Sequence, residues 1–287
     1  MTDLAQSALR RSPSRSWGKL RANRGAMVGA AIVVVFVVLA VLAPLLPITE
    51  PTVTDWAAIR KPPSATAWLG TDELGRDLLS RMIWGARASL MAGVISVAIA
   101  LAVGVPIGVL AGYFGGWTDQ IISRATDALL AMPFLILAIA LAAFLGPSLT
   151  NAMIAIGLSA VPIFIRLTRG QVLAVKVEDY VEGARAVGLG HMRIMQRYIL
   201  PNVFAPILVQ ATLTIASAII AEASLSFLGL GQQPPAPSWG SMLNTAKSFL
   251  EQAPWLAIWP GVAIFLVVIG FNLFGDGLRD ALDPREN

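Results

Sequence analysis

Residues 180–201 read YVEGARAVGLGHMRIMQRYILP and form the longest charged and polar interval in the second half of an otherwise apolar chain. We expect two short helices here, joined at residues 188–190 and ended by Pro201. In the second helix, apolar residues recur at helical spacing on one face and polar residues occupy the other. The apolar face holds Met192, Met195, Tyr198 and Ile199; the polar face holds Arg193, Gln196 and Arg197. Such a helix can lie on lipid, pack on its own bundle or dock into a groove of a soluble partner.

The low content of charged residues is typical of an integral membrane protein. Of the 287 residues, 56% are apolar and 13% are charged, and the mean hydropathy is +0.71. A soluble domain carries about 25% charged residues. The chain has no cysteine and a single histidine, His191, which argues against disulfides, thiol catalysis and a histidine metal cluster. The formal charge of +4 fits basic cytoplasmic loops, so no nucleic-acid partner is expected.

Apolar runs of about the 20 residues that a bilayer core requires predict an all-α membrane protein with six transmembrane helices. The predicted spans cover residues 27–46, 89–113, 123–145, 152–167, 203–221 and 255–274. Pro133 is expected to kink the third span. The segment 47–88 is predicted to end in an amphipathic helix, 74–84, that could lie on the membrane surface. A second long loop is expected at 222–253.

These spans divide the chain into an amino-terminal tail, an outer segment, a core and a carboxyl-terminal tail. The amino-terminal tail is 1–24, and the first helix with its outer segment is 25–88. The core of five helices is 89–278 and contains a polar loop at 176–201, and the carboxyl-terminal tail is 279–287. With both termini inside, about 15 of the 21 basic residues face the cytoplasm, where Lys and Arg concentrate. The loop 176–201 is then cytoplasmic.

Four glycines recur at four-residue spacing, at positions 104, 108, 112 and 116. Small residues at this period let two helix backbones approach closely within a membrane. The partner helix is expected to belong either to the same bundle or to a second subunit.

Polar residues within the predicted spans are few. Asp127 lies one turn from Arg124, and a local ion pair is favoured over a proton relay. Glu222 either forms a structural hydrogen bond to the following loop or lines a path. Asn272 is expected to hydrogen-bond another helix rather than to meet a substrate. One isolated carboxylate does not resemble an ion pathway, so the energy for any pumping is expected to come from a partner.

Catalytic and nucleotide-binding signatures are absent from the sequence. It contains no G-x-x-x-x-G-K-[ST], no H-E-x-x-H and no G-x-S-x-G. The chain is therefore not expected to be an enzyme, and an intramembrane hydrolase is disfavoured. An ATP-independent channel or secondary carrier is the remaining alternative, disfavoured by the lack of visible internal repeats.

The opening stretch contains Glu182-Gly183-Ala184, then Gly188, then Leu200-Pro201. This spacing resembles the E-A-A-x3-G-x9-I-x-L-P loop of ABC importer permeases. In that family this loop is the coupling helix, which sits in a cleft of the ATP-hydrolysing subunit. Two positions depart from the pattern, since Gly183 replaces an alanine and Tyr198 replaces an isoleucine. Glycine in place of alanine weakens a helix by up to about 1 kcal/mol.

Three further blocks resemble the C-type permease subunit of dipeptide, oligopeptide and nickel importers; they are residues 68–81, 223–241 and 275–284. The resemblance implies a type I ABC importer permease fold in a bacterial inner membrane. It implies a homologous permease as partner in a heterodimer, two cytoplasmic ATPase subunits that bind ATP and Mg, and a periplasmic or lipid-anchored substrate-binding protein. No cofactor is expected on this chain. Dipeptides, oligopeptides, glutathione, nickel chelates and opines all remain open as substrates.

The resemblance also implies roles for single residues. Glu182 is expected to contact the ATPase, Ala184 to offer it a small surface, and Gly188 to make a turn. Arg193 and Arg197 either contact acidic ATPase residues or keep the loop inside. Leu200 and Pro201 are expected to end the helix and seat it against the fifth span. In the outer segment, four residues either contact the binding protein or order the segment itself: Asp72, Gly75, Arg76 and Asp77.

Overall fold

The computed structural model describes residues 13–282, with side chains from residue 18 onward. The rest of the two predicted tails, 1–12 and 283–287, lies outside the described residues. The described chain consists of helices and connecting loops. The helices are α2 (Pro13–Ala22), α3 (Arg24–Leu42), η1 (Ala43–Leu45), η2 (Trp56–Ala58), α4 (Leu78–Phe114), α5 (Gly116–Leu130), α6 (Phe134–Leu145), α7 (Leu149–Val175), α8 (Asp179–Ala186), α9 (His191–Ile194), η3 (Met195–Ile199), α10 (Leu200–Phe227), α11 (Trp239–Ala246) and α12 (Trp255–Leu282).

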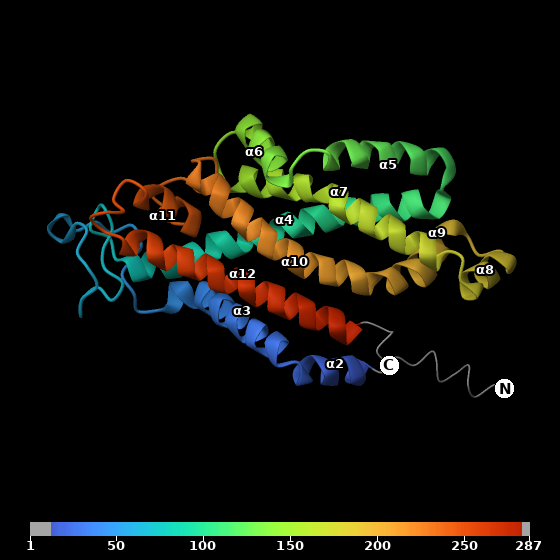
Figure 1. The fold of residues 1–287 in the computed structure, drawn as a ribbon, viewed down its shortest axis with the longest axis horizontal. Helices are drawn as coiled ribbons and strands as arrows, with labels where there is room; N and C mark the ends of the chain where they lie inside the picture. Colours follow the sequence, from blue (N-terminus) through green and yellow to red (C-terminus); the bar gives the residue numbers. More distant parts are fainter. Residues whose placement is uncertain (1–12, 283–287) are drawn as a thin grey trace.

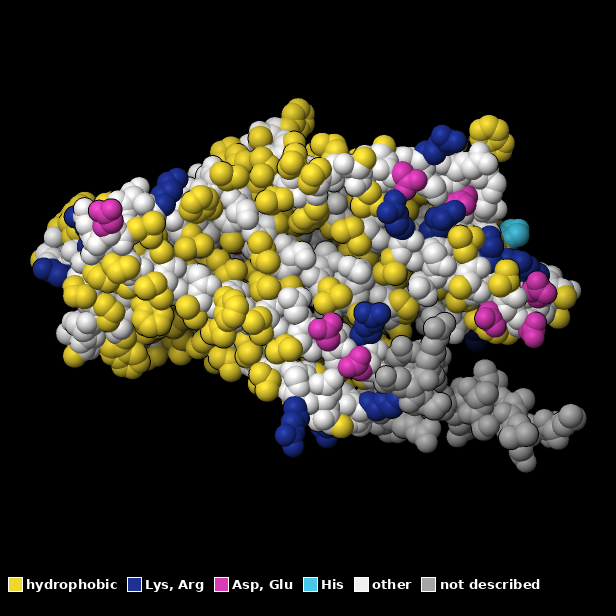
Figure 2. All heavy atoms as spheres, in the orientation of Figure 1, with side chains coloured by type: hydrophobic (Ala, Val, Ile, Leu, Met, Phe, Trp, Pro, Cys, Tyr) yellow, Lys and Arg dark blue, Asp and Glu magenta, His cyan; other side chains and the backbone are white. Residues whose placement is uncertain are grey.

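The long helices run along the length of the molecule, and the polar segments gather at its two ends (Figure 1). The segment 47–77 and α11 lie at one end, which we call the segment end. The helices α2, α8 and α9 lie at the opposite end, which we call the loop end. Apolar side chains cover most of the visible face between them, and charged side chains gather toward the loop end (Figure 2).

Five helices of the described chain are long and apolar enough to cross a membrane, and a bent pair, α5 with α6, makes a sixth candidate. The two helices of this pair meet at 90°, and the break falls at Pro133, where a kink is predicted. Proline disfavours the helical conformation for the residue before it and donates no hydrogen bond. The bend is sharper than a proline kink alone produces, and α5 lies alongside α7 while α6 turns across it (Figure 1).

The glycine stripe packs helices of the same bundle. A Cβ atom built on Gly104, Gly108 or Gly112 would lie 2.7–2.9 Å from atoms of α7. These glycines therefore let α4 and α7 approach backbone to backbone, the close packing that small residues allow in membranes. Gly116, the last of the four, has a φ of +52° and instead belongs to the tight turn between α4 and α5.

The predicted surface helix 74–84 is wrong. Residues from Leu78 onward begin α4, which continues without interruption for 37 residues to Phe114. Leu78 is buried against Trp239 and its neighbours, because the loop before α11 and α11 itself cover this first turn. The apolar residues of 78–84 thus meet protein in the fold, where the sequence pattern alone indicated a membrane surface.

Candidate docking loop and neighbouring cavity

The α8–α9 loop (residues 176–201) turns at Gly188. Gly188 has a φ of +77°, which confirms the predicted turn glycine. The Gly188 amide donates to the Arg185 carbonyl at 2.9 Å, and the Leu189 amide donates to the Ala184 carbonyl at 3.2 Å. This pair of bonds is the Schellman pattern that closes a helix at a left-handed residue. The turn therefore sets the direction in which α9 leaves α8.

One face of the loop is packed on its own bundle. Val181, Ala184 and Ile194 are buried and join the core cluster that includes α4 and α7. The predicted role of Ala184 as an outward contact is therefore wrong: its small side chain lets α8 pack closely against the rest of the chain. Gly183 faces open space, and a Cβ there would meet nothing within 4 Å.

The opposite face points outward and mixes charged with apolar side chains. Val187 is 76% exposed and Met192 is 61% exposed. The predicted apolar face is divided between two of its possible uses: Met195 and Ile199 pack on the bundle, whereas Met192 is exposed. Glu182, Arg193 and Arg197 of the same loop are exposed as well.

Pro201 does not end the helix, contrary to the prediction. The chain runs as one helix from His191 to Phe227, with a wider π-helical turn, η3, just before Pro201. Proline lacks an N–H and its ring crowds the carbonyl four residues earlier. The wide turn relieves that conflict: the Leu200 amide reaches back to Met195, and the Asn202 side chain donates to the Tyr198 carbonyl at 2.7 Å. Single π turns inside α-helices are frequent at functional sites.

His191 anchors the loop to α4 and is not a plain surface residue. Its Nδ1 lies 2.9 Å from the hydroxyl of Tyr113, which is in the last turn of α4. The guanidinium of Arg185 lies over the ring of the same tyrosine, 5.4 Å from its centroid. No sequence pattern indicates this cluster, because Tyr113 is 78 residues away from His191.

Ion pairs join α5 to α7 near the loop end. Arg169 donates to Asp119 at 2.7 Å, and Arg166 pairs with Asp127. The predicted ion pair between Asp127 and Arg124 is therefore wrong. The alignment of α5 beside α7 offers Asp127 a partner on the neighbouring helix (Figure 1).

Glu222 is fully buried and hydrogen-bonded. It accepts from Ser226 at 2.6 Å and from Ser89 of α4 at 3.0 Å. The Ser89 hydroxyl also accepts from the Trp239 amide at 3.3 Å, which brings in the start of α11. Glu222 thus connects α10 to α4 directly and to α11 through Ser89. Of its two predicted roles, these contacts support the structural one. Asn272 is exposed on α12 and forms no hydrogen bond to another helix within the described chain.

The four predicted residues of the outer segment order that segment. Asp72 accepts from the backbone amide of Arg76 at 2.9 Å and from its Nε at 2.6 Å. Asp72 also lies 3.2 Å from Nε of Arg81. Gly75 has a φ of +73° and no room for a Cβ against Asp55. Asp77 caps α4 by accepting from the Ser80 amide. Burial raises the pKa of Glu73, and the negative charge of Asp72 beside it raises that pKa further.

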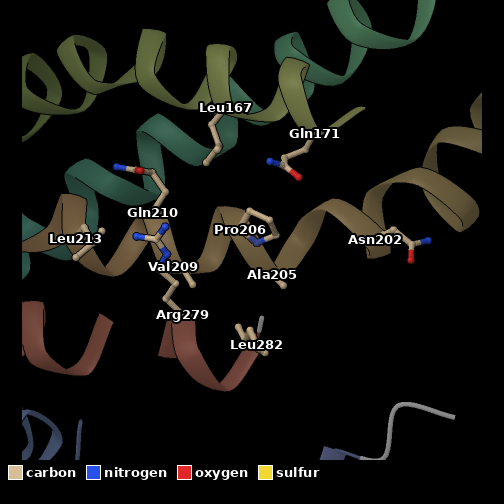
Figure 3. A pocket seen from close by; sticks show the side chains of 10 residues that line it. All are labelled: Leu167, Gln171, Asn202, Ala205, Pro206, Val209, Gln210, Leu213, Arg279 and Leu282. Atoms are coloured by element: carbon tan, nitrogen blue, oxygen red, sulfur yellow. The ribbon is translucent and has the colours of Figure 1, made fainter. Parts of the chain in front are cut away.

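A cavity of about 570 Å³ opens near the loop end between α7, α10 and α12 (Figure 3). Amide side chains line it from two helices, Gln171 on α7 and Gln210 on α10, and Arg279 extends toward it from α12 (Figure 3). Leu167, Val209 and Leu213 supply apolar walls. No local sequence pattern marks this cavity, because its lining residues are spread over more than a hundred positions.

Comparison with known proteins identifies the class. Residues 104–287 match the family of binding-protein-dependent transport system inner membrane components, and residues 14–63 match the N-terminal transmembrane domain of oligopeptide transport permease C. The chain belongs to this family of ABC importer permeases. It is 48% identical to the dipeptide transport system permease protein DppC of Alkalihalophilus pseudofirmus over 275 residues, 96% of this chain and 90% of that protein.

Two further matches are a relative in sequence and a relative in fold. The glutathione transport system permease protein GsiD of Escherichia coli is 45% identical over 270 residues, 94% of this chain and 89% of that protein. A chain of the MetNI methionine ABC transporter, in an inward facing crystal form, aligns with a TM-score of 0.59 at 19% identity, covering 72% of this chain and 98% of its own. The predicted type I importer permease fold is thereby confirmed.

Proposed function

We propose that this chain imports small peptides as one permease of an ATP-driven importer in a bacterial inner membrane. It would form half of the translocation path with a homologous permease and transmit the motion of ATPase subunits through the α8–α9 loop. It carries no catalytic role of its own. The peptide substrate is supported by the names of the relatives, which are permeases for dipeptides and for glutathione.

The outward face of the α8–α9 loop is the observation that carries the proposal. Val187 and Met192 are the most exposed large apolar side chains of α8, α9 and the turn between them, and Glu182, Arg193 and Arg197 of the same loop are also exposed. An exposed apolar patch with a polar rim is typical of a protein–protein contact. The Schellman turn and the Tyr113–His191 contact fix this surface before a partner arrives, which lowers the entropy cost of binding.

The orientation follows from the distribution of charge over the two ends. The helix α2 and the α8–α9 loop share the loop end (Figure 1), and both are basic. The rule that Lys and Arg concentrate in cytoplasmic loops supports an orientation with this end and both termini inside. ATP and Mg would be bound there by two ATPase subunits, and a substrate-binding protein would dock at the segment end, where Trp56 and Trp68 are exposed.

Copurification tests the docking surface. The complete importer is purified through a tag on this chain, and the bound ATPase subunits are quantified. Met192→Asp places a charge on the exposed apolar surface, and we expect it to reduce ATPase recovery at least tenfold, an energy of about 1.4 kcal/mol or more. Glu182→Lys should weaken recovery in the same direction.

Leu250→Asp is the matched control, because Leu250 is also an exposed apolar residue but lies in the loop between α11 and α12. Full ATPase recovery is expected with this variant. If Met192→Asp and Leu250→Asp retain the ATPase subunits equally, the docking surface is not on the α8–α9 loop.

A further inference from the structure

The cavity between α7, α10 and α12 has the size and chemistry of a small-molecule site. Its volume of about 570 Å³ falls in the range of ligand pockets, roughly 300–1,000 Å³. Three helices form its walls, so its shape depends on the bundle itself and not on a surface loop (Figure 3). Polar groups from α7, α10 and α12 share it with apolar side chains, the mixture that orients a ligand in such sites.

Arg279 gives the cavity a positive charge without a matching acid. Among the described residues, 13–282, no Asp or Glu lines the cavity. Among residues 13–282, Arg279 forms no ion pair, although Asp276 and Asp280 are close to it along α12. The described ion pairs lie instead in the outer segment and between α5 and α7. A guanidinium that faces a hollow with no carboxylate of its own is suited to an anionic ligand.

The other polar lining groups suit a peptide backbone. Gln171 and Gln210 each offer an amide donor and an amide acceptor. The amide nitrogen of Gln210 donates to Thr214 at 3.2 Å, which leaves its carbonyl oxygen available to a ligand N–H. Leu167, Val209 and Leu213 would take an apolar side chain. A lipid phosphate satisfies the guanidinium equally well, but the acyl chains attached to it gain nothing from paired amides.

We propose that this cavity is a binding site for the carboxylate of a small peptide on the loop-end half of the molecule. Arg279 holds the carboxylate, and the two glutamines hold the peptide groups. This proposal rests on the proposed function. It adds the place where the peptide contacts this chain before the peptide is released at the loop end. The helix α10 forms one wall and continues directly from η3 and the α8–α9 loop, so movement of the loop would reshape the site.

Cysteine labelling tests the charge of the cavity. The chain contains no cysteine, so Ala205→Cys, at a position that lines the cavity but holds no ligand group in this proposal, creates a single reactive thiol in this subunit. The complete importer in nanodiscs is treated with an anionic and a cationic methanethiosulfonate reagent of similar size. We expect the anionic reagent to react faster, and Arg279→Gln to reduce that preference by roughly tenfold, the lower end of electrostatic focusing in a cleft.

Ala125→Cys with and without Arg124→Gln is the matched control. Ala125 and Arg124 are exposed neighbours on α5 and do not line the cavity. Removal of Arg124 should change the preference at this open surface much less than removal of Arg279 changes it in the cavity. An equal change at both sites would overturn the claim that the cavity concentrates anions.

Protection experiments test the ligand. A tripeptide with a free carboxylate should slow labelling of Ala205→Cys, and the same tripeptide with a carboxyl-terminal amide should not. The proposal is overturned if both peptides protect equally, if neither protects, or if only nanodiscs made with phosphatidylglycerol in place of phosphatidylcholine protect. The last outcome would assign the site to a lipid headgroup. ATPase recovery in the same preparations separates failure of the importer assignment from failure of this site.

Discussion

The hydroxyl of Tyr113 and Nδ1 of His191 lie 2.9 Å apart and connect the last turn of α4 to the first turn of α9. Tyr113 is buried, and its ring also receives the guanidinium of Arg185 from α8. Both arms of the α8–α9 loop therefore contact one side chain of a helix that runs the length of the bundle. A force applied to the loop reaches α4 through this contact.

Tyr113→Phe removes the hydroxyl and keeps the ring. One hydrogen bond contributes about 1 kcal/mol, so the loop should open about fivefold more often. Hydrogen exchange of the backbone amides of residues 184–194 should accelerate by that factor, while ATPase recovery stays unchanged. In proteoliposomes we expect more ATP to be hydrolysed for each peptide imported.

Tyr198→Phe serves as the control for this change, because Tyr198 is partly buried in the same loop and its hydroxyl has no partner in the described chain. Its exchange and coupling should match those of the parent. Equal exchange rates in all three proteins would show that the Tyr113–His191 contact does not hold the loop.

Gly108→Ala tests the packing of α4 on α7. The added Cβ would lie 2.7 Å from Cβ of Thr168 and 2.8 Å from the carbonyl oxygen of Ile165. Two helix backbones would have to separate, and overpacking of this kind costs about 1–3 kcal/mol. The thermal midpoint of the purified complex should fall. Gly170→Ala is the matched change on α7, where a Cβ meets nothing within 4 Å, and it should leave the midpoint unchanged or raise it.

The parts of the structure that depend on local sequence were predictable. Apolar runs located the spans, Pro133 located the break between α5 and α6, and the need for a left-handed residue located the turn at Gly188. Each of these is decided by a few consecutive residues. The angle of the break was not predictable, because it depends on the position of α5 beside α7.

The errors concern which neighbour a side chain meets. Asp127 was paired with a residue one turn away, but the fold presents Arg166 from another helix. Met192 has helical spacing with the packed residues Met195 and Ile199, yet it is exposed, so spacing alone does not tell which residues of that face meet the bundle. The cavity was missed for the same reason, since no periodicity within one helix reports that Gln171, Gln210 and Arg279 converge.

Glu222→Ala distinguishes a structural carboxylate from one that meets substrate. The change leaves Ser89 and Ser226 without their buried acceptor and opens a void between α10 and α4. Loss of a buried hydrogen-bond partner costs about 1–3 kcal/mol for each group left unsatisfied, so the complex should be less stable and poorly recovered. Glu251→Ala, at an exposed position, should behave as the parent. A stable Glu222→Ala complex with altered transport would place this carboxylate on the path instead.

Asp72→Asn and Glu73→Gln are neighbouring changes of equal size that should have opposite consequences. Asp72 pairs with Arg76 and Arg81 in a buried network, and removing its charge leaves Arg81 without a carboxylate and Arg76 with Glu73 alone. Breaking a buried pair in this way costs about 3–5 kcal/mol, so Asp72→Asn should expose the outer segment to proteolysis.

Glu73 differs because burial and the charge of Asp72 raise its pKa, so the folded segment favours its neutral form. A raised pKa means that its contribution to stability is complete below the ordinary carboxyl pKa and is lost as the pH rises through the shifted value. Glu73→Gln, which is always neutral, should therefore leave the segment at least as resistant at neutral pH as the parent. Limited proteolysis of the purified complex at pH 5 and pH 7.5 measures both effects, and equal sensitivity of the two variants would contradict the separate roles assigned to these carboxylates.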